Sequence, residues 1–124
     1  MILEFSCSNH KSILNKITFS TIATSDTIFE EKVKKFDDLR ILNAAVIYGA
    51  NGSGKSNVLD AISFVKNLVL NSVNHQPGQG IRQVPHKLCG FNKESTYQIQ
   101  FITKGIRYAY GFSLNNMLVS EEYL

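Results

Sequence analysis

Residues 49–56 read Gly-Ala-Asn-Gly-Ser-Gly-Lys-Ser and match the pattern G-x-x-x-x-G-K-[ST] at every defined position. A polyphosphate needs several hydrogen-bond donors that point inward from a concave loop, and glycines leave room for that approach. We therefore predict that the backbone amides of residues 52–56 form an anion nest. A helix that begins near Ser56 adds its positive N-terminal end. Lys55 is predicted to reach the β- and γ-phosphates, and the Ser56 hydroxyl to ligate Mg²⁺.

The chain on either side of this loop supplies the setting that such a loop requires. Residues 44–48 read Ala-Ala-Val-Ile-Tyr without polar alternation, which predicts a strand buried on both faces. In residues 56–71 apolar side chains recur at helical spacing, which predicts an amphipathic helix. Its stripe consists of Val58, Ile62, Val65 and Val69. A strand, a glycine-rich loop and a helix in this order open an α/β unit, so α/β is the predicted fold class.

Alternating polar and apolar residues predict strands at both ends of the chain. Residues 2–7 and 17–22 are predicted to form an antiparallel pair. Residues 29–36 are predicted to form a short helix, and residues 74–85, which hold both prolines, a loop. The C-terminal part predicts an antiparallel meander with one apolar face, built from residues 97–101, 106–114 and 117–122. Lys104-Gly105 and Asn115-Asn116 are its predicted turns.

Composition indicates one globular, water-soluble domain. The chain has 124 residues, of which 44% are hydrophobic and 19% charged, and these values exclude a disordered or collagen-like chain. No apolar run approaches the roughly 20 residues that cross a bilayer, so we expect no membrane partner. The net charge of +3 comes without the basic stripe that is typical of a nucleic-acid interface. Cys7 and Cys89 form no disulfide framework, and a cytoplasmic location is expected.

The exact amino-acid sequence of the loop resembles that of one family. Residues 49–57 resemble the Walker A loop of ABC-type AAA family ATPases of the structural-maintenance-of-chromosomes and RecF group. Residues 9–12, Asn-His-Lys-Ser, resemble the Asn-aromatic-Arg/Lys-Ser stretch that lies by the nucleotide in that group, with His10 in place of the aromatic residue. The sequence of residues 97–112 is similar to that of bacterial ATP-binding proteins of the abortive-infection and overcoming-lysogenization-defect groups.

This resemblance implies the N-terminal lobe of an ABC-type ATPase head, a partial P-loop NTPase fold. Residues 1–73 would hold the N-terminal strand pair, the P-loop strand and the helix, and residues 87–124 the antiparallel β subdomain. ATP and Mg²⁺ are the implied cofactors, with Ser56 as the metal ligand. The implied nucleotide-binding residues are Lys11, Ser12, Gly49, Asn51, Gly52, Ser53, Gly54, Lys55, Ser56 and Asn57.

Several parts of an ATP-hydrolysing site are missing from the sequence. Hydrolysis needs a second acidic strand end for Mg²⁺ and a group that positions water, and no apolar run that ends in Asp-Glu follows Ser56. The Leu-Ser-Gly-Gly-like signature of the ABC group is also missing. We therefore expect this chain to be part of a larger ATPase, to bind nucleotide weakly and to hydrolyse little. The resemblance implies phage defence or DNA maintenance as the function of the intact protein.

Other interpretations remain open at this point. Self-association or a second ATPase head is an expected partner, because a split lobe leaves strand edges and apolar faces uncovered. Nucleic acid is a further candidate partner of the intact protein. The main alternative function is a degenerate, non-catalytic P-loop domain that acts as an assembly module. A metal site at His86 and Cys89 is a weaker candidate, since two ligands are too few for a closed zinc site.

Overall fold

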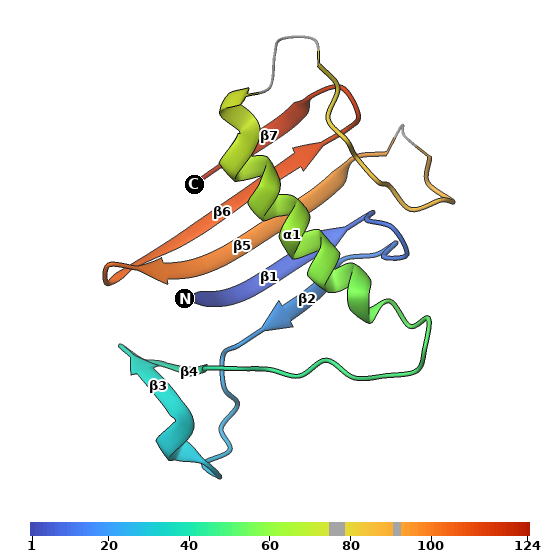
Figure 1. The fold of residues 1–124 in the computed structure, drawn as a ribbon. Helices are drawn as coiled ribbons and strands as arrows, with labels where there is room; N and C mark the ends of the chain where they lie inside the picture. The colour runs from blue at the N-terminus through green and yellow to red at the C-terminus, as the bar shows by residue number, and fades with distance from the viewer. Residues whose placement is uncertain (75–78, 91–92) are drawn as a thin grey trace.

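The computed structural model describes residues 1–74, 79–90 and 93–124. One helix lies across a five-stranded antiparallel sheet, and a small hairpin stands beside them (Figure 1). The sheet has the order β2-β1-β5-β6-β7. Its strands are β1 (Ile2–Ser8), β2 (Ile17–Ser20), β5 (Ser95–Thr103), β6 (Ile106–Leu114) and β7 (Val119–Tyr123). The other elements are η1 (Glu30–Lys32), the hairpin strands β3 (Val33–Phe36) and β4 (Leu39–Leu42), α1 (Lys55–Asn71) and η2 (Ser72–Asn74).

The predicted N-terminal strand pair and C-terminal meander are both confirmed, and they share one sheet. β1 pairs antiparallel with β2 on one side and with β5 on the other. Lys104 and Gly105 have φ values of 50° and 75°, the left-handed backbone that a two-residue hairpin turn requires. Before β7, the side-chain oxygen of Asn115 accepts bonds from the amides of Met117 and Leu118, which builds the second predicted turn.

The predicted helix is confirmed as α1, and Val58, Ile62 and Val65 of its apolar stripe pack on the sheet, whereas Val69 is 46% exposed. Ala61 and Val65 are buried against a cluster of side chains from the sheet. This cluster includes Phe5, Cys7, Tyr97, Phe112 and Leu114. Burial also raises the pKa of the Cys7 thiol to about 11, so this cysteine stays a neutral thiol near pH 7.

The prediction of a helix over residues 29–36 is wrong. Only residues 30–32 form a short 3-10 turn, and Val33–Phe36 pairs with Leu39–Leu42 as a hairpin. Asp37 in the connection takes a φ of 49°, which aspartate tolerates better than most residues. Ile41 is fully buried with Leu3 and Ile102, so tertiary packing of the hairpin outweighs the local helical stripe.

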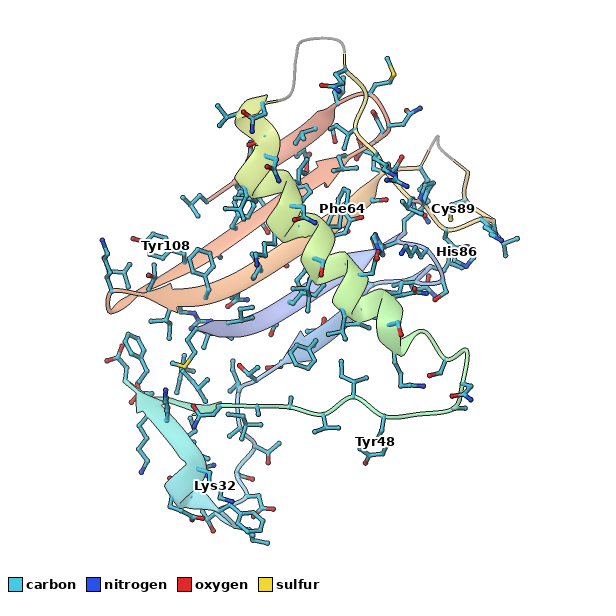
Figure 2. All side chains as sticks on the ribbon, in the orientation of Figure 1. Lys32, Tyr48, Phe64, His86, Cys89 and Tyr108 are labelled. Atoms are coloured by element: carbon cyan, nitrogen blue, oxygen red, sulfur yellow. The ribbon has the colours of Figure 1, made fainter. Side chains whose placement is uncertain are left out.

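The predicted buried strand over residues 44–48 is also contradicted. These residues are extended but pair with no strand, and all five are exposed. Val46 is 83% and Tyr48 89% exposed, and Tyr48 points away from the body of the molecule (Figure 2). A strand needs a neighbour for its main-chain hydrogen bonds, and no strand of the described residues pairs with this segment. In the predicted loop, residues 79–85 form neither helix nor strand, and residues 75–78 lie outside the described residues.

The aromatic layer under α1 leads to a stability prediction. Phe112 is 3% exposed and contacts the rings of Tyr97 and Tyr110. Phe112→Ala should therefore lower the free energy of unfolding by about 3–5 kcal/mol. The matched control, Leu88→Ala, trims a side chain that is 86% exposed, and should change stability by less than about 0.5 kcal/mol. Urea unfolding followed by circular dichroism measures both, and equal effects would contradict the assignment of the core.

Candidate nucleotide-binding site

The glycine-rich loop bends sharply just before α1. Gly52 and Gly54 have φ values of 80° and 93°, in the left-handed region that favours glycine. A side chain at Gly52 would meet nothing within 4 Å, whereas a Cβ at Gly54 would lie 3.1 Å from the Ser12 hydroxyl. At Gly52 only the backbone conformation favours glycine, whereas at Gly54 a side chain would also crowd Ser12.

Several amides of this bend donate to no backbone or side-chain acceptor in the described chain. These are the N–H groups of Gly52, Gly54, Lys55 and Ser56. Ser53 differs from the prediction, because its amide donates to the Ala50 carbonyl at 3.2 Å. The first turn of α1 holds no acidic side chain, so nothing of opposite charge neutralises the positive end of the helix there. Together these donors make a concave surface suited to an anion.

The Lys55 side chain folds back over the same loop. Its ammonium donates to the carbonyls of Gly49 at 2.8 Å and Ala50 at 2.7 Å. Lys55 is half-buried, whereas Asn51 and Ser56 are exposed. A positive charge therefore lies directly on the loop and adds to the field of the helix end.

A cavity of about 460 Å³ opens beside the loop. Its walls come from the loop, from residues 12–17 and from the exposed segment 44–48. They include Ser12, Asn15, Tyr48, Ser53, Lys55 and Val58. The lining contains no acidic side chain, and Lys55 is its one charged residue among the described residues, so the cavity favours an anionic ligand.

Residues 9–12 lie against α1, close to the start of the helix where the glycine-rich loop ends. The Asn57 amide donates to the Ser12 hydroxyl at 2.6 Å, which brings these two predicted site residues together next to Gly54. Asn9 is fully buried and holds this segment in place. Its amide donates to the carbonyls of Lys93 and Glu94, and its oxygen accepts from the amide of His86.

Lys11 lies elsewhere. Its ammonium is 2.7 Å from a carboxylate oxygen of Asp60, on the face of α1 that borders a different cavity, lined by Phe64 and Val84. The structure thus does not bring the predicted residue Lys11 to the loop amides. Sequence reasoning missed Asp60, although it is the single acidic residue of α1.

His10 connects this ion pair to the core. The ring is fully buried, with Nε2 2.9 Å from Asp60 Oδ2 and Nδ1 2.8 Å from the Tyr97 hydroxyl. Because a carboxylate only accepts, Nε2–H donates to Asp60, and Nδ1 accepts from the Tyr97 O–H. Burial lowers the pKa of His10 below its ordinary value in spite of the nearby carboxylate. Hydrogen bonds from Lys11 and then His10 lower the pKa of Asp60.

The described residues hold no group of three or more His, Cys, Asp or Glu side chains that could bind a metal ion. His86 and Cys89 belong to one turn, in which the His86 carbonyl accepts from the Cys89 amide at 2.8 Å and His86 Nδ1 accepts from the Leu88 amide. A P-loop needs no such group, since it contributes one hydroxyl to Mg²⁺ and the phosphates contribute further ligands. The exposed hydroxyl of Ser56, at the first turn of α1, fits that requirement.

The buried imidazole leads to a prediction about pH. The folded chain keeps His10 neutral below the ordinary pKa of 6.5, while the unfolded chain takes up the proton. The contribution to stability is therefore complete above that value and is lost as the pH falls below it. In urea unfolding between about pH 7.5 and pH 5, His10→Phe should reduce this loss, whereas the control His86→Phe should keep it. An identical pH dependence in all three proteins would contradict the assignment.

One family profile matches most of the chain. The sequence profile of the family described as "AAA domain, putative AbiEii toxin, Type IV TA system" matches residues 44–124. The match includes the glycine-rich loop, α1 and the strands β5, β6 and β7. Neither the curated proteins nor the solved structures contain a match. No helix within the described ranges combines the length and the apolar character needed to span a bilayer. With about two thirds of its length matched, the chain belongs to this family of AAA ATPase domains.

Proposed function

We propose that residues 49–57 bind Mg²⁺-ATP, within the nucleotide-binding function that the AAA family implies. The observation that carries the proposal is the set of four free amides at Gly52, Gly54, Lys55 and Ser56. Backbone donors at a helix N-terminus form a ready anion site. Beside them the cavity carries the Lys55 charge and no carboxylate, which matches the high negative charge of a triphosphate.

Each residue of the loop would have a separate task. The amides would donate to phosphate oxygens, and the Lys55 ammonium would bind the β- and γ-phosphates. Bound Mg²⁺ neutralises charge on the phosphates, and the Ser56 hydroxyl would be its protein ligand. The remaining proposed contacts come from Gly49, Asn51, Ser53, Asn57 and Ser12. Lys11 would join them only after leaving Asp60, which holds its ammonium at 2.7 Å.

The wider role follows from the family and is likewise a proposal. We propose that the domain works in phage defence or DNA maintenance in the bacterial cytoplasm, consistent with the toxin named in the family description. A second ATPase head and a nucleic acid are the proposed macromolecular partners. Without a second acidic strand end after Ser56, residues 1–124 alone should release little phosphate.

Removing the Lys55 charge tests the proposed site. Lys55→Ala deletes charge-assisted hydrogen bonds, each worth about 1.5–3 kcal/mol, so ATP affinity should fall by at least about tenfold. The matched control is Lys66→Ala, which removes an exposed lysine from the same helix and should leave the affinity unchanged. Isothermal titration calorimetry with ATP and Mg²⁺ measures both. Absence of binding heat in the unaltered chain would overturn the proposal and favour the non-catalytic assembly module.

Removing the Ser56 hydroxyl separates the metal from the phosphates. The amides that face the anion remain in Ser56→Ala, so ATP should still bind in excess EDTA as it does to the unaltered chain. The gain in affinity on adding Mg²⁺ should shrink, because the protein ligand to the ion is gone. Ser63→Ala, on an exposed face of the same helix, is the control. Equal Mg²⁺ dependence in both variants would show that Ser56 does not ligate the ion.

A further inference from the structure

The side chains of Lys11 and Ser12 point to two different places on α1. Ser12 Oγ accepts from the Asn57 amide at 2.6 Å, beside Gly54. The Lys11 ammonium lies 2.7 Å from Asp60 Oδ1 instead. Asn57 and Asp60 are three positions apart on the helix, so they are neighbours on one face, with about 5–6 Å between their Cβ atoms. The charge of Lys11 therefore lies about one helical turn beyond the contact that Ser12 makes at the glycine-rich loop.

The main chain of residues 9–12 is held without this ion pair. The Lys11 amide donates to the Val84 carbonyl at 2.8 Å, and the His10 amide donates to the Ile13 carbonyl at 2.9 Å. The buried side chain of Asn9 adds hydrogen bonds on both of its polar atoms. Because these contacts fix the backbone, the flexible four-carbon stem of Lys11 can turn without displacing its neighbour Ser12.

The Asp60 carboxylate can release Lys11 at small cost. The side chains of Lys11 and Asp60 are 36% and 41% exposed, and ion pairs with that much solvent contact are weak. After release, Asp60 Oδ2 still accepts from His10 Nε2–H at 2.9 Å, and solvent reaches Oδ1. The carboxylate therefore keeps a hydrogen-bond partner whether or not Lys11 is bound to it.

One polyanion can attract both the free amides of the loop and the Lys11 ammonium. Asp60 is four residues beyond Ser56, which is about 6 Å along the helix axis. A triphosphate held by the amides of Gly54, Lys55 and Ser56 would present several negatively charged oxygens, whereas Asp60 presents one carboxylate. Attraction to the phosphates therefore competes with the ion pair, and it competes more strongly as the charge of the ligand grows.

We propose that Asp60 withholds Lys11 from the glycine-rich loop, and that a bound nucleoside triphosphate draws the ammonium from the carboxylate to its phosphates. The inference rests on the proposed function of residues 49–57 and adds Asp60 as a residue that sets the affinity. Each binding event breaks the ion pair, so the carboxylate lowers the affinity that Lys11 would otherwise provide. Asp60 acts through Lys11 and is therefore a positioning residue.

Removing the Asp60 charge tests the proposal by isothermal titration calorimetry with ATP and Mg²⁺ on the 124-residue chain. Asp60→Asn keeps an acceptor for His10 but frees Lys11, so the affinity for ATP should rise about two- to fivefold. The matched control, Asp38→Asn, makes the same change at an exposed residue between β3 and β4 and should leave the affinity unchanged. A lower affinity in Asp60→Asn, as expected if the ion pair only holds the segment in place, or an equal change in both variants would overturn the proposal.

A double-mutant cycle shows whether Asp60 acts through Lys11. Lys11→Met removes the charge and keeps an unbranched, flexible side chain. The loss of ATP affinity that it causes should be about two- to fivefold larger in the Asp60→Asn background than in the unaltered chain. Lys66→Met, at an exposed lysine of the same helix, should cause no loss in either background. Losses of equal size for Lys11→Met in both backgrounds would contradict the proposal.

A measurement on the unaltered chain does not depend on the folding of Asp60→Asn. In proton NMR spectra, the resonance of His10 Nε2–H should shift when Mg²⁺-ATP is added, because the ammonium that shares Asp60 with this group departs. In Lys11→Met the same addition should leave the resonance in place. No shift in the unaltered chain with ATP bound would overturn the proposal.

Lys55→Ala separates this proposal from the proposed function. If ATP binds the unaltered chain and Lys55→Ala weakens binding, but Asp60→Asn does not strengthen it, only the role of Asp60 is overturned. Absence of ATP binding in the unaltered chain and in every variant would overturn both proposals.

Discussion

The arrangement of the whole molecule depends on how α1 is held over the sheet by one buried aromatic residue. The Tyr97 ring lies 5.2 Å from the rings of both Phe64 on α1 and Phe112 on β6, while its hydroxyl hydrogen-bonds His10. His10 in turn contacts Asp60 on α1. Tyr97 therefore joins helix, sheet and the segment that carries Ser12. Because the glycine-rich loop ends where α1 begins, this packing also sets where its free amides point.

Much of this fold follows from local patterns. The helical spacing of Val58, Ile62 and Val65 predicted α1, and alternation predicted the strands at both ends, because each pattern matches an element that buries one face. The hairpin of residues 33–42 was missed, although Asp37-Asp38 is a turn signal. There the spacing of Phe29, Val33 and Phe36 resembled a helix face.

The remaining features depend on contacts between distant residues, which no local pattern contains. Pairing of β1 with β5 joins residues about a hundred positions apart, and neither strand specifies its neighbour. The Asp60 carboxylate meets His10 and Lys11 only after α1 has docked. Residues 44–48 have the composition of a buried strand, but composition cannot supply the neighbouring strand that burial needs. In the candidate site the motif identified the loop, whereas the pairing of Lys11 with Asp60 emerged only from the structure.

The two carbonyl groups that accept from Lys55 have a thermodynamic consequence. These hydrogen bonds, of 2.8 Å to Gly49 and 2.7 Å to Ala50, already use part of the hydrogen-bonding capacity of the ammonium group. A phosphate oxygen would compete with these internal acceptors, so the enthalpy gained at Lys55 would be the difference between two sets of hydrogen bonds. A neutral or singly charged ligand would gain too little binding enthalpy to replace the two carbonyl groups. A polyanion would gain more, because it also reaches the free amides. If the loop binds nucleotide as proposed, the folded-back lysine would favour polyanions over ligands of lower charge.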